Sequence, residues 1–114
     1  MTGPWRESKL FGSERRTQVL LLLALLGESY PGELTRLLGA KKAAVLYIVD
    51  GLEAEGVLAS QRLGRTRKLT LDPRYYAAKE LKALLIPLAE ADPALRKIAA
   101  TRRGRPRRKG KDVR

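Results

Sequence analysis

The segment from Glu14 to Leu26 limits the possible folds of this chain more than any other feature. It includes eight consecutive apolar residues, Val19 to Leu26, and it lies between Ser13, a typical N-cap, and Gly27, a typical helix end. The helix that it predicts is apolar on nearly every side. Such a helix must be covered all round, which is difficult in a chain of 114 residues. We therefore expect a second copy of the chain to cover part of it.

Four other segments carry helical signals. Pro31 suits the first position of a short helix. Between Val45 and Leu52, apolar residues recur at i, i+3, i+4 and i+7, which places them on one buried helix face. Two Asp-Pro pairs, at residues 72–73 and 92–93, are typical helix starts because Asp caps and Pro fits the first turn. The expected helices cover residues 14–26, 31–38, 41–55, 73–91 and 94–101.

Two short alternating segments, residues 57–62 and 67–71, predict the strands of a hairpin. The loop between them contains Gly64, where a positive φ costs little. Three helices, a two-stranded hairpin and further helices are the order of a winged helix-turn-helix. We therefore expect a mainly α fold with a small β-hairpin that dimerises through its terminal helices. Residues 1–9 would form a flexible arm, residues 10–101 the winged-helix domain and residues 102–114 a disordered basic tail.

The charge of the chain indicates its class of partner. Lys and Arg number 24 against 12 Asp and Glu, a net charge of +12, which favours nucleic acid, an anionic membrane or an acidic protein. The longest apolar run has eight residues, whereas a membrane span needs about 20. We therefore expect a cytoplasmic, nucleoid-associated protein with no membrane partner.

Catalysis and metal binding are disfavoured by the residue types that the chain lacks. It has neither Cys nor His, which excludes zinc fingers, disulfides, thiol chemistry and imidazole acid–base catalysis. Its carboxylates are scattered, and no glycine-rich loop with Gly-Lys-Ser/Thr is present. We expect no enzyme activity, no metal and no cofactor, and these residues leave open whether a small-molecule effector binds.

The helix over residues 41–55 is the candidate reading helix. Such a helix places small or polar side chains of its N-terminal half in the major groove. Lys42 is suited to phosphate or guanine, Ala43 to a thymine methyl group and Tyr47 to phosphate. The alternatives are a three-helix core whose third helix has a solvated face, and a winged helix that binds protein. The candidate DNA-contacting residues are Lys41, Lys42, Ala43, Leu46 and Tyr47.

Four cations surround the tip of the predicted hairpin. A basic hairpin of this shape can lie along the minor groove, where narrow A·T stretches concentrate negative potential. The alternative is a charged edge strand that discourages aggregation, but this explains one or two charges rather than four of one sign. The candidate wing residues are Arg62, Arg65, Thr66, Arg67 and Lys68.

Three stretches resemble the ArsR-like winged-helix transcription regulators, and together they extend over residues 10–71. They are residues 11–16, residues 44–57 with their Leu-Glu-x-x-Gly-apolar step, and residues 64–71 around the basic wing. The resemblance implies a homodimer held by the first and last helices. It does not imply metal sensing, because the Cys and His ligands of metal-sensing members are absent. The leucines expected at the dimer interface are Leu20, Leu23, Leu81 and Leu85.

The C-terminal segment, residues 102–114, has eight basic residues and one acid. It has too few apolar residues to fold alone. Arg103-Gly104-Arg105-Pro106 resembles an AT-hook, in which glycine permits close approach and proline keeps the chain extended in a narrow A·T minor groove. The alternative is a polybasic tail that binds phosphates without base preference. The candidate tail residues are Arg102, Arg103, Gly104, Arg105, Pro106, Arg107, Arg108 and Lys109.

Together these features predict a homodimer that binds double-stranded DNA and regulates transcription. Two alternatives remain. One is an architectural, chromatin-like DNA binder with low sequence specificity. The other is a protein-interaction winged helix that docks a partner through Leu46 and Tyr47.

Overall fold

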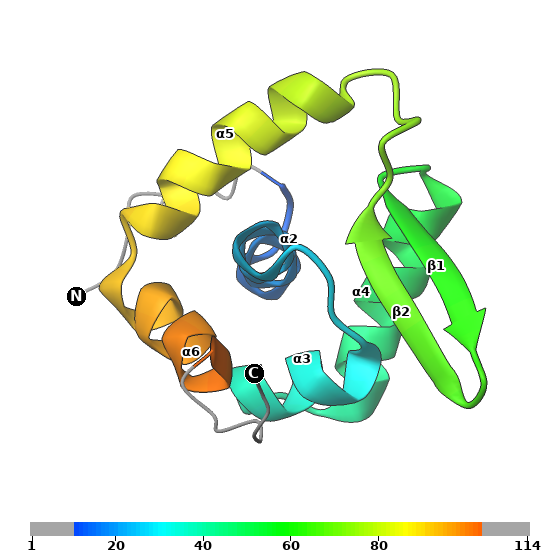
Figure 1. Cartoon of the computed structure of the whole chain (residues 1–114), viewed down its shortest axis with the longest axis horizontal. Coiled ribbons are helices and arrows are strands. Elements are labelled where there is room, and N and C mark those ends of the chain that lie inside the picture. The colour runs from blue at the N-terminus through cyan, green and yellow to red at the C-terminus, as the bar shows by residue number, and fades with distance from the viewer. Residues whose placement is uncertain (1–10, 104–114) are drawn as a thin grey trace, which may run out of the picture.

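The computed structural model describes residues 11–103 of the chain. Its element order confirms the predicted class, because three helices precede an antiparallel hairpin and two helices follow it (Figure 1). The fold is a mainly helical winged helix-turn-helix. Its elements are α2 (Glu14–Leu26), α3 (Pro31–Leu38), α4 (Lys42–Ala54), β1 (Leu58–Leu63), β2 (Thr66–Leu71), α5 (Ala78–Glu90) and α6 (Pro93–Arg103).

Helix α2 lies in the middle of the molecule. Figure 1 shows it end-on, with α5, α6, α3 and the layer of α4 and the hairpin arranged around it. The side chains from Val19 to Leu23 are at most 2% exposed. The expectation that a second copy must cover this helix is therefore wrong: one chain covers it, because helices from both ends of the sequence pack on its different sides. Leu20, Leu23 and Leu85, expected at a dimer interface, lie in this core.

The helix-turn-helix consists of α3, a short turn and α4. Gly39 ends α3 with the left-handed φ of +62°, which glycine adopts at little cost. Lys41 is the N-cap of α4 and has an extended backbone, so it precedes the helix instead of opening it. Val45, Val49 and Leu52 face the core, as the apolar spacing predicted. The turn thus sets the angle between α3 and α4 and leaves the start of α4 exposed at the surface.

The hairpin pairs Leu58 with Leu71 at its base and Leu63 with Thr66 at its tip. Gly64, with φ +62°, occupies the tight turn. A contact that the sequence did not predict extends this sheet: the N–H groups of Ser29 and Leu69 donate to each other's carbonyls, at 3.0 and 2.7 Å. This isolated bridge joins the hairpin to the segment between α2 and α3.

Helix α5 begins at Ala78, five residues later than the Asp72-Pro73 start expected from the sequence. The Asp72 carboxylate accepts the backbone N–H of Arg74 at 2.9 Å, and the Asp72 carbonyl accepts the N–H of Tyr75 at 3.0 Å. These local bonds satisfy the backbone in a turn that competes with the helix. The long helix predicted over residues 73–91 is therefore shorter, Ala78–Glu90.

Helix α6 is capped as predicted and runs further than expected. The Asp92 carboxylate accepts the N–H groups of Ala94 and Leu95, at 2.9 and 3.3 Å. The helix ends at Arg103 instead of Thr101. The guanidinium of Arg102 lies 3.2 Å from a carboxylate oxygen of Glu33, whose side chain is 5% exposed, and also donates to the Glu28 carbonyl at 3.0 Å. Arg102 therefore belongs to the folded domain and not to a disordered tail.

Removing the Arg102 side chain should destabilise the fold. Arg102→Ala leaves the Glu33 carboxylate with Ser29 Oγ, at 2.6 Å, as its remaining described partner. Hydrogen bonds to charged groups contribute roughly 1.5–3 kcal/mol, so we expect the free energy of unfolding to fall by about 2 kcal/mol. Urea denaturation measures this change. Arg96→Ala, an exposed cation of the same helix, is the matched control, and equal unfolding midpoints for the two variants would contradict the assignment.

Candidate nucleic-acid interface

The start of α4 presents an exposed, positively charged surface. Lys41, Lys42 and Ala43 are all exposed, and the first turn of the helix contains no acid. Unpaired N–H groups at a helix start add a partial positive charge. Neither lysine makes an ion pair within residues 11–103. This end of α4 can therefore bind an anion with both its side chains and its backbone.

One helical turn further along α4, the two predicted contact residues differ in their surroundings. Tyr47 is 83% exposed, so its ring and hydroxyl are free to contact another molecule. Leu46 is half-buried, so part of its side chain contributes to the fold. Tyr47 is the more available of the two residues.

The tip of the hairpin is also exposed and basic. Arg62 and Arg65 are exposed, as is Thr66, the first residue of β2. The tip and the start of α4 both lie in the lower half of Figure 1. Neither arginine has an ionic partner in the described part of the chain. The hairpin tip therefore carries two positive charges that are free within the described residues.

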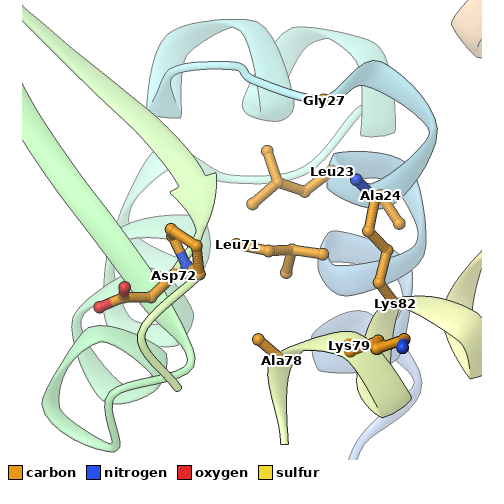
Figure 2. A pocket seen from close by; sticks show the side chains of 9 residues that line it. Leu23, Ala24, Gly27, Leu71, Asp72, Ala78, Lys79 and Lys82 are labelled. Atoms are coloured by element: carbon orange, nitrogen blue, oxygen red, sulfur yellow. The ribbon is translucent and has the colours of Figure 1, made fainter. Parts of the chain in front are cut away.

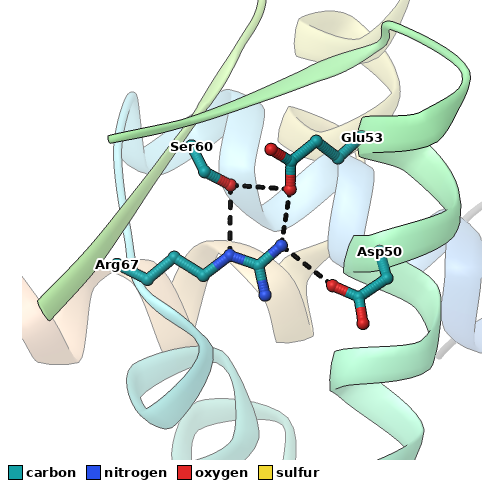
Figure 3. A network of polar contacts seen from close by, with 4 residues as sticks. All are labelled: Asp50, Glu53, Ser60 and Arg67. Carbon is teal, nitrogen blue, oxygen red and sulfur yellow. Dashed lines mark hydrogen bonds and ion pairs between the residues drawn. The ribbon is translucent and has the colours of Figure 1, made fainter. Parts of the chain in front are cut away.

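Arg67 differs from these two arginines, although the sequence grouped all three as free wing cations. Figure 3 shows its guanidinium between Asp50 and Glu53 of α4, with Ser60 of β1 beside it. It donates to the Asp50 carboxylate at 2.9 Å, to the Glu53 carboxylate at 2.5 Å and to Ser60 Oγ at 3.1 Å. Its side chain is 21% exposed. Partial burial acts against its charge, but the bonds to Glu53 and Asp50 outweigh it and raise the pKa of Arg67 above its ordinary value.

This network partly neutralises the carboxylates at the C-terminal end of α4. Asp50 and Glu53 pair with Arg67, and Glu55 pairs with Arg16 of α2 at 2.7 Å. Lys68, another predicted wing residue, lies 3.7 Å from Glu28 and is half-buried. The Asp50–Glu53–Arg67 network keeps one negative charge, whereas Lys41, Lys42, Arg62 and Arg65 are four exposed cations with no ion pair among the described residues. Arg36, in the last turn of α3, is a further exposed cation, which the sequence did not indicate as a site residue.

The role of Arg67 can be separated from that of a phosphate-binding arginine. Arg67→Met should lower the free energy of unfolding by about 1 kcal/mol, since it breaks a partly exposed network of charged hydrogen bonds. Arg65→Ala should leave stability unchanged, because Arg65 contacts no carboxylate among residues 11–103. Chemical denaturation of both variants measures the difference. If Arg67→Met is as stable as the wild type, the network does not hold the hairpin against α4.

The remaining predicted site residues lie at or beyond the end of α6. Arg102 pairs with Glu33 in the fold, and Arg103 is the last residue of the helix. Gly104, Arg105, Pro106, Arg107, Arg108 and Lys109 lie outside the described residues, as does the arm expected over residues 1–9.

Two other kinds of feature are absent from residues 11–103. No group of three or more Asp or Glu residues there is arranged to hold a metal ion. No helix in that range is long and apolar enough to cross a membrane.

Comparison with solved structures finds a likeness to a transcriptional regulator. The chain matches the crystal structure of transcriptional regulator Tm0710 from Thermotoga maritima, with a TM-score of 0.56 and 26% sequence identity. The match covers 85% of this chain and 67% of that one. No protein-family model and no curated protein sequence matches the chain. The chain therefore has the winged-helix fold of a transcriptional regulator.

Proposed function

We propose that this chain binds double-stranded DNA in a sequence-directed manner and regulates transcription, as the ArsR-like proteins that it resembles do. One observation gives the main support for this proposal. Asp50 and Glu53 of α4 and its C-cap Glu55 are paired with arginines, while Lys41, Lys42, Arg62 and Arg65 remain exposed and unpaired within the described residues. A surface of this kind attracts phosphates, because its four unpaired cations outnumber the one negative charge left in the Asp50–Glu53–Arg67 network. The likeness to Tm0710 supports the same function.

The two basic elements would contact different parts of the duplex. The start of α4 enters the major groove, with Lys42 near phosphate or guanine, Ala43 near a base edge and Tyr47 near the backbone. The hairpin tip lies along the adjacent minor groove through Arg62, Arg65 and Thr66. Arg67 acts indirectly, because it holds the hairpin against α4 through Asp50 and Glu53.

Selection of bound sequences from a random DNA pool tests this proposal. A sequence-directed regulator should enrich a defined motif, repeated with dyad symmetry if the protein is a dimer. Its specific affinity should exceed its affinity for random DNA by about a thousandfold or more. Binding without enrichment would favour the architectural alternative. Absence of binding would refute the proposal and favour docking of a protein through Leu46 and Tyr47.

We also propose that residues 104–114 add an AT-hook-like contact with the minor groove. Of that segment's 11 residues, six are Lys or Arg and one is Asp, and a tethered basic arm binds the same duplex at high effective concentration. A chain that ends at Arg103 should therefore bind DNA more weakly but unfold at nearly the same temperature. A chain that ends at Thr101 should also lose stability, because it lacks Arg102.

The Gly104→Ala/Pro106→Ala variant separates a hook from a polybasic tail. A hook needs the close approach and extended backbone that these residues allow. The variant should therefore lose affinity at A·T-rich flanks more than at G·C-rich flanks, measured at one salt concentration. Equal affinity of the variant and the wild type on both duplexes would leave only phosphate binding.

A homodimer would use a surface other than the core leucines. We propose the outer side of α5, where Leu84 is 42% exposed and Ala83 and Pro87 are also exposed. Tyr76, just before the helix, is 91% exposed. Apolar side chains on one helix side are typical of interfaces between identical chains. Half-buried Leu81, also expected at the interface, lies on the same helix.

A further inference from the structure

A cavity of about 330 Å³ opens between the end of α2, the end of β2 and the start of α5. Figure 2 shows the side chains of Leu23 and Leu71 at its centre, with Ala78 on the side of α5. Ala24 and Pro73 complete a mostly apolar wall. This volume lies at the lower end of the range for small-molecule sites, about 300–1,000 Å³, so it suits a compact ligand.

Two unpaired cations line this cavity. Lys79 and Lys82 of α5 line it, both are exposed, and neither makes an ion pair within residues 11–103. In Figure 2 the Lys82 side chain extends from α5 toward Ala24 and so runs along the cavity. An apolar wall with unpaired ammonium groups at its edge is complementary to an anion with an apolar body.

The one acid of the lining does not oppose this charge. Figure 2 shows the Asp72 carboxylate directed away from Leu71 and the two lysines. Arg74 binds it through its backbone N–H at 2.9 Å and its guanidinium at 3.3 Å. These bonds hold the pKa of Asp72 below its ordinary value, so it stays ionised and paired with Arg74. The net electrostatic potential at the cavity is therefore positive and comes from the two lysines.

We propose that this cavity binds a small carboxylate with an apolar, ring-sized body. The apolar portion would lie against Leu23, Leu71 and Ala78, and the carboxylate would face Lys79 and Lys82. Such a ligand would touch α2, the last residue of the hairpin and α5 at the same time. This site goes beyond DNA binding and is tested on the free protein, so its outcome does not depend on the proposed function.

Calorimetric titration of the full chain with 2-naphthoate and with 2-naphthamide tests the proposal, because the two probes share a shape and differ in charge. The acid should bind at least about tenfold more tightly than the amide, since one favourable charge contact of about 1.4 kcal/mol corresponds to that factor. The Lys79→Met/Lys82→Met variant should bind both probes equally. Arg96→Met/Lys97→Met, with the same change in net charge on α6, should keep the preference for the acid.

A cavity-filling variant tests the location independently. Ala78→Phe should abolish binding of both probes, and its thermal midpoint shows whether it folds. If it does not fold, the lysine variants still decide the question. No binding of 2-naphthoate at millimolar concentration would overturn the proposal. So would equal binding of acid and amide by the wild type, or an unchanged preference in the Lys79→Met/Lys82→Met variant.

Discussion

Leu85→Glu is expected to unfold the chain. Leu85 is fully buried in the core around α2, and loss of a buried leucine side chain alone costs about 2–5 kcal/mol. The substitution also places a carboxylate in a fully buried apolar position, where an unpaired charge is strongly unfavourable. Small domains have a total stability of about 5–15 kcal/mol, so most of it would be lost. Circular dichroism should show little residual helix and no cooperative thermal transition.

Leu84→Glu is the matched control, one position earlier in the same helix. Leu84 is 42% exposed, so the charge can remain in water and the fold should survive. If the outer side of α5 forms the proposed homodimer, this variant should sediment as a monomer at concentrations where the wild type is a dimer. A wild type that is already monomeric at tens of micromolar would refute the dimer. A folded Leu85→Glu variant would contradict the single-chain core.

Removal of four interface cations should have the largest effect on DNA binding. Lys41→Ala, Lys42→Ala, Arg62→Ala and Arg65→Ala together remove the free positive charge of α4 and the hairpin tip. Each lost phosphate contact reduces the slope of log affinity against log salt by about 0.9, so the slope should fall by as much as about 3.6. Affinity at near-physiological salt should decrease by roughly two orders of magnitude. Fluorescence anisotropy across a salt series measures both quantities.

Two pairs of variants control for net charge. The first pair is Lys41→Ala/Lys42→Ala at the start of α4, and the second is Lys79→Ala/Lys82→Ala on α5. Both pairs change the net charge by the same amount. Helix α5 lies on the opposite side of α2 from α3, the helix that leads into α4 (Figure 1). The α4 pair should weaken binding and reduce the salt slope by about 1.8. The α5 pair should leave the slope nearly unchanged. Equal effects of the two pairs would mean that the overall charge of the chain, and not a defined surface, attracts DNA.

The features of the fold that depend on neighbouring residues could be predicted from the sequence. Ser13 caps α2, with its hydroxyl accepting the N–H of Arg16 at 3.0 Å, and Asp92 caps α6. Gly64 occupies the hairpin turn. These signals act over three or four residues, so the sequence contains them completely. The order of helices and strands followed from them.

The predictions that were wrong concern contacts between distant segments of the chain. The sequence shows that α2 is apolar all round, but not that α5 and α6 return to cover it. It shows Arg67 and Arg102 as basic residues near other basic residues, but not that each faces carboxylates from another element. Two residues that pair across 14 to 69 positions leave no local sequence pattern that predicts the ion pair. Three of the cations predicted to contact DNA, Arg67, Lys68 and Arg102, therefore pair with carboxylates in the fold.

An NMR titration of the nitrogen-15-labelled chain with a DNA duplex tests the central claim most directly, because it reports both binding and its location. The account predicts that amide signals of Lys42, Ala43, Gly64 and Arg65 shift or broaden as DNA is added. Signals of Leu84 and Ala91, on α5 and just after it, should stay in place. Shifts concentrated on α5, or no shifts at all at low salt, would contradict a DNA-binding surface formed by α4 and the hairpin.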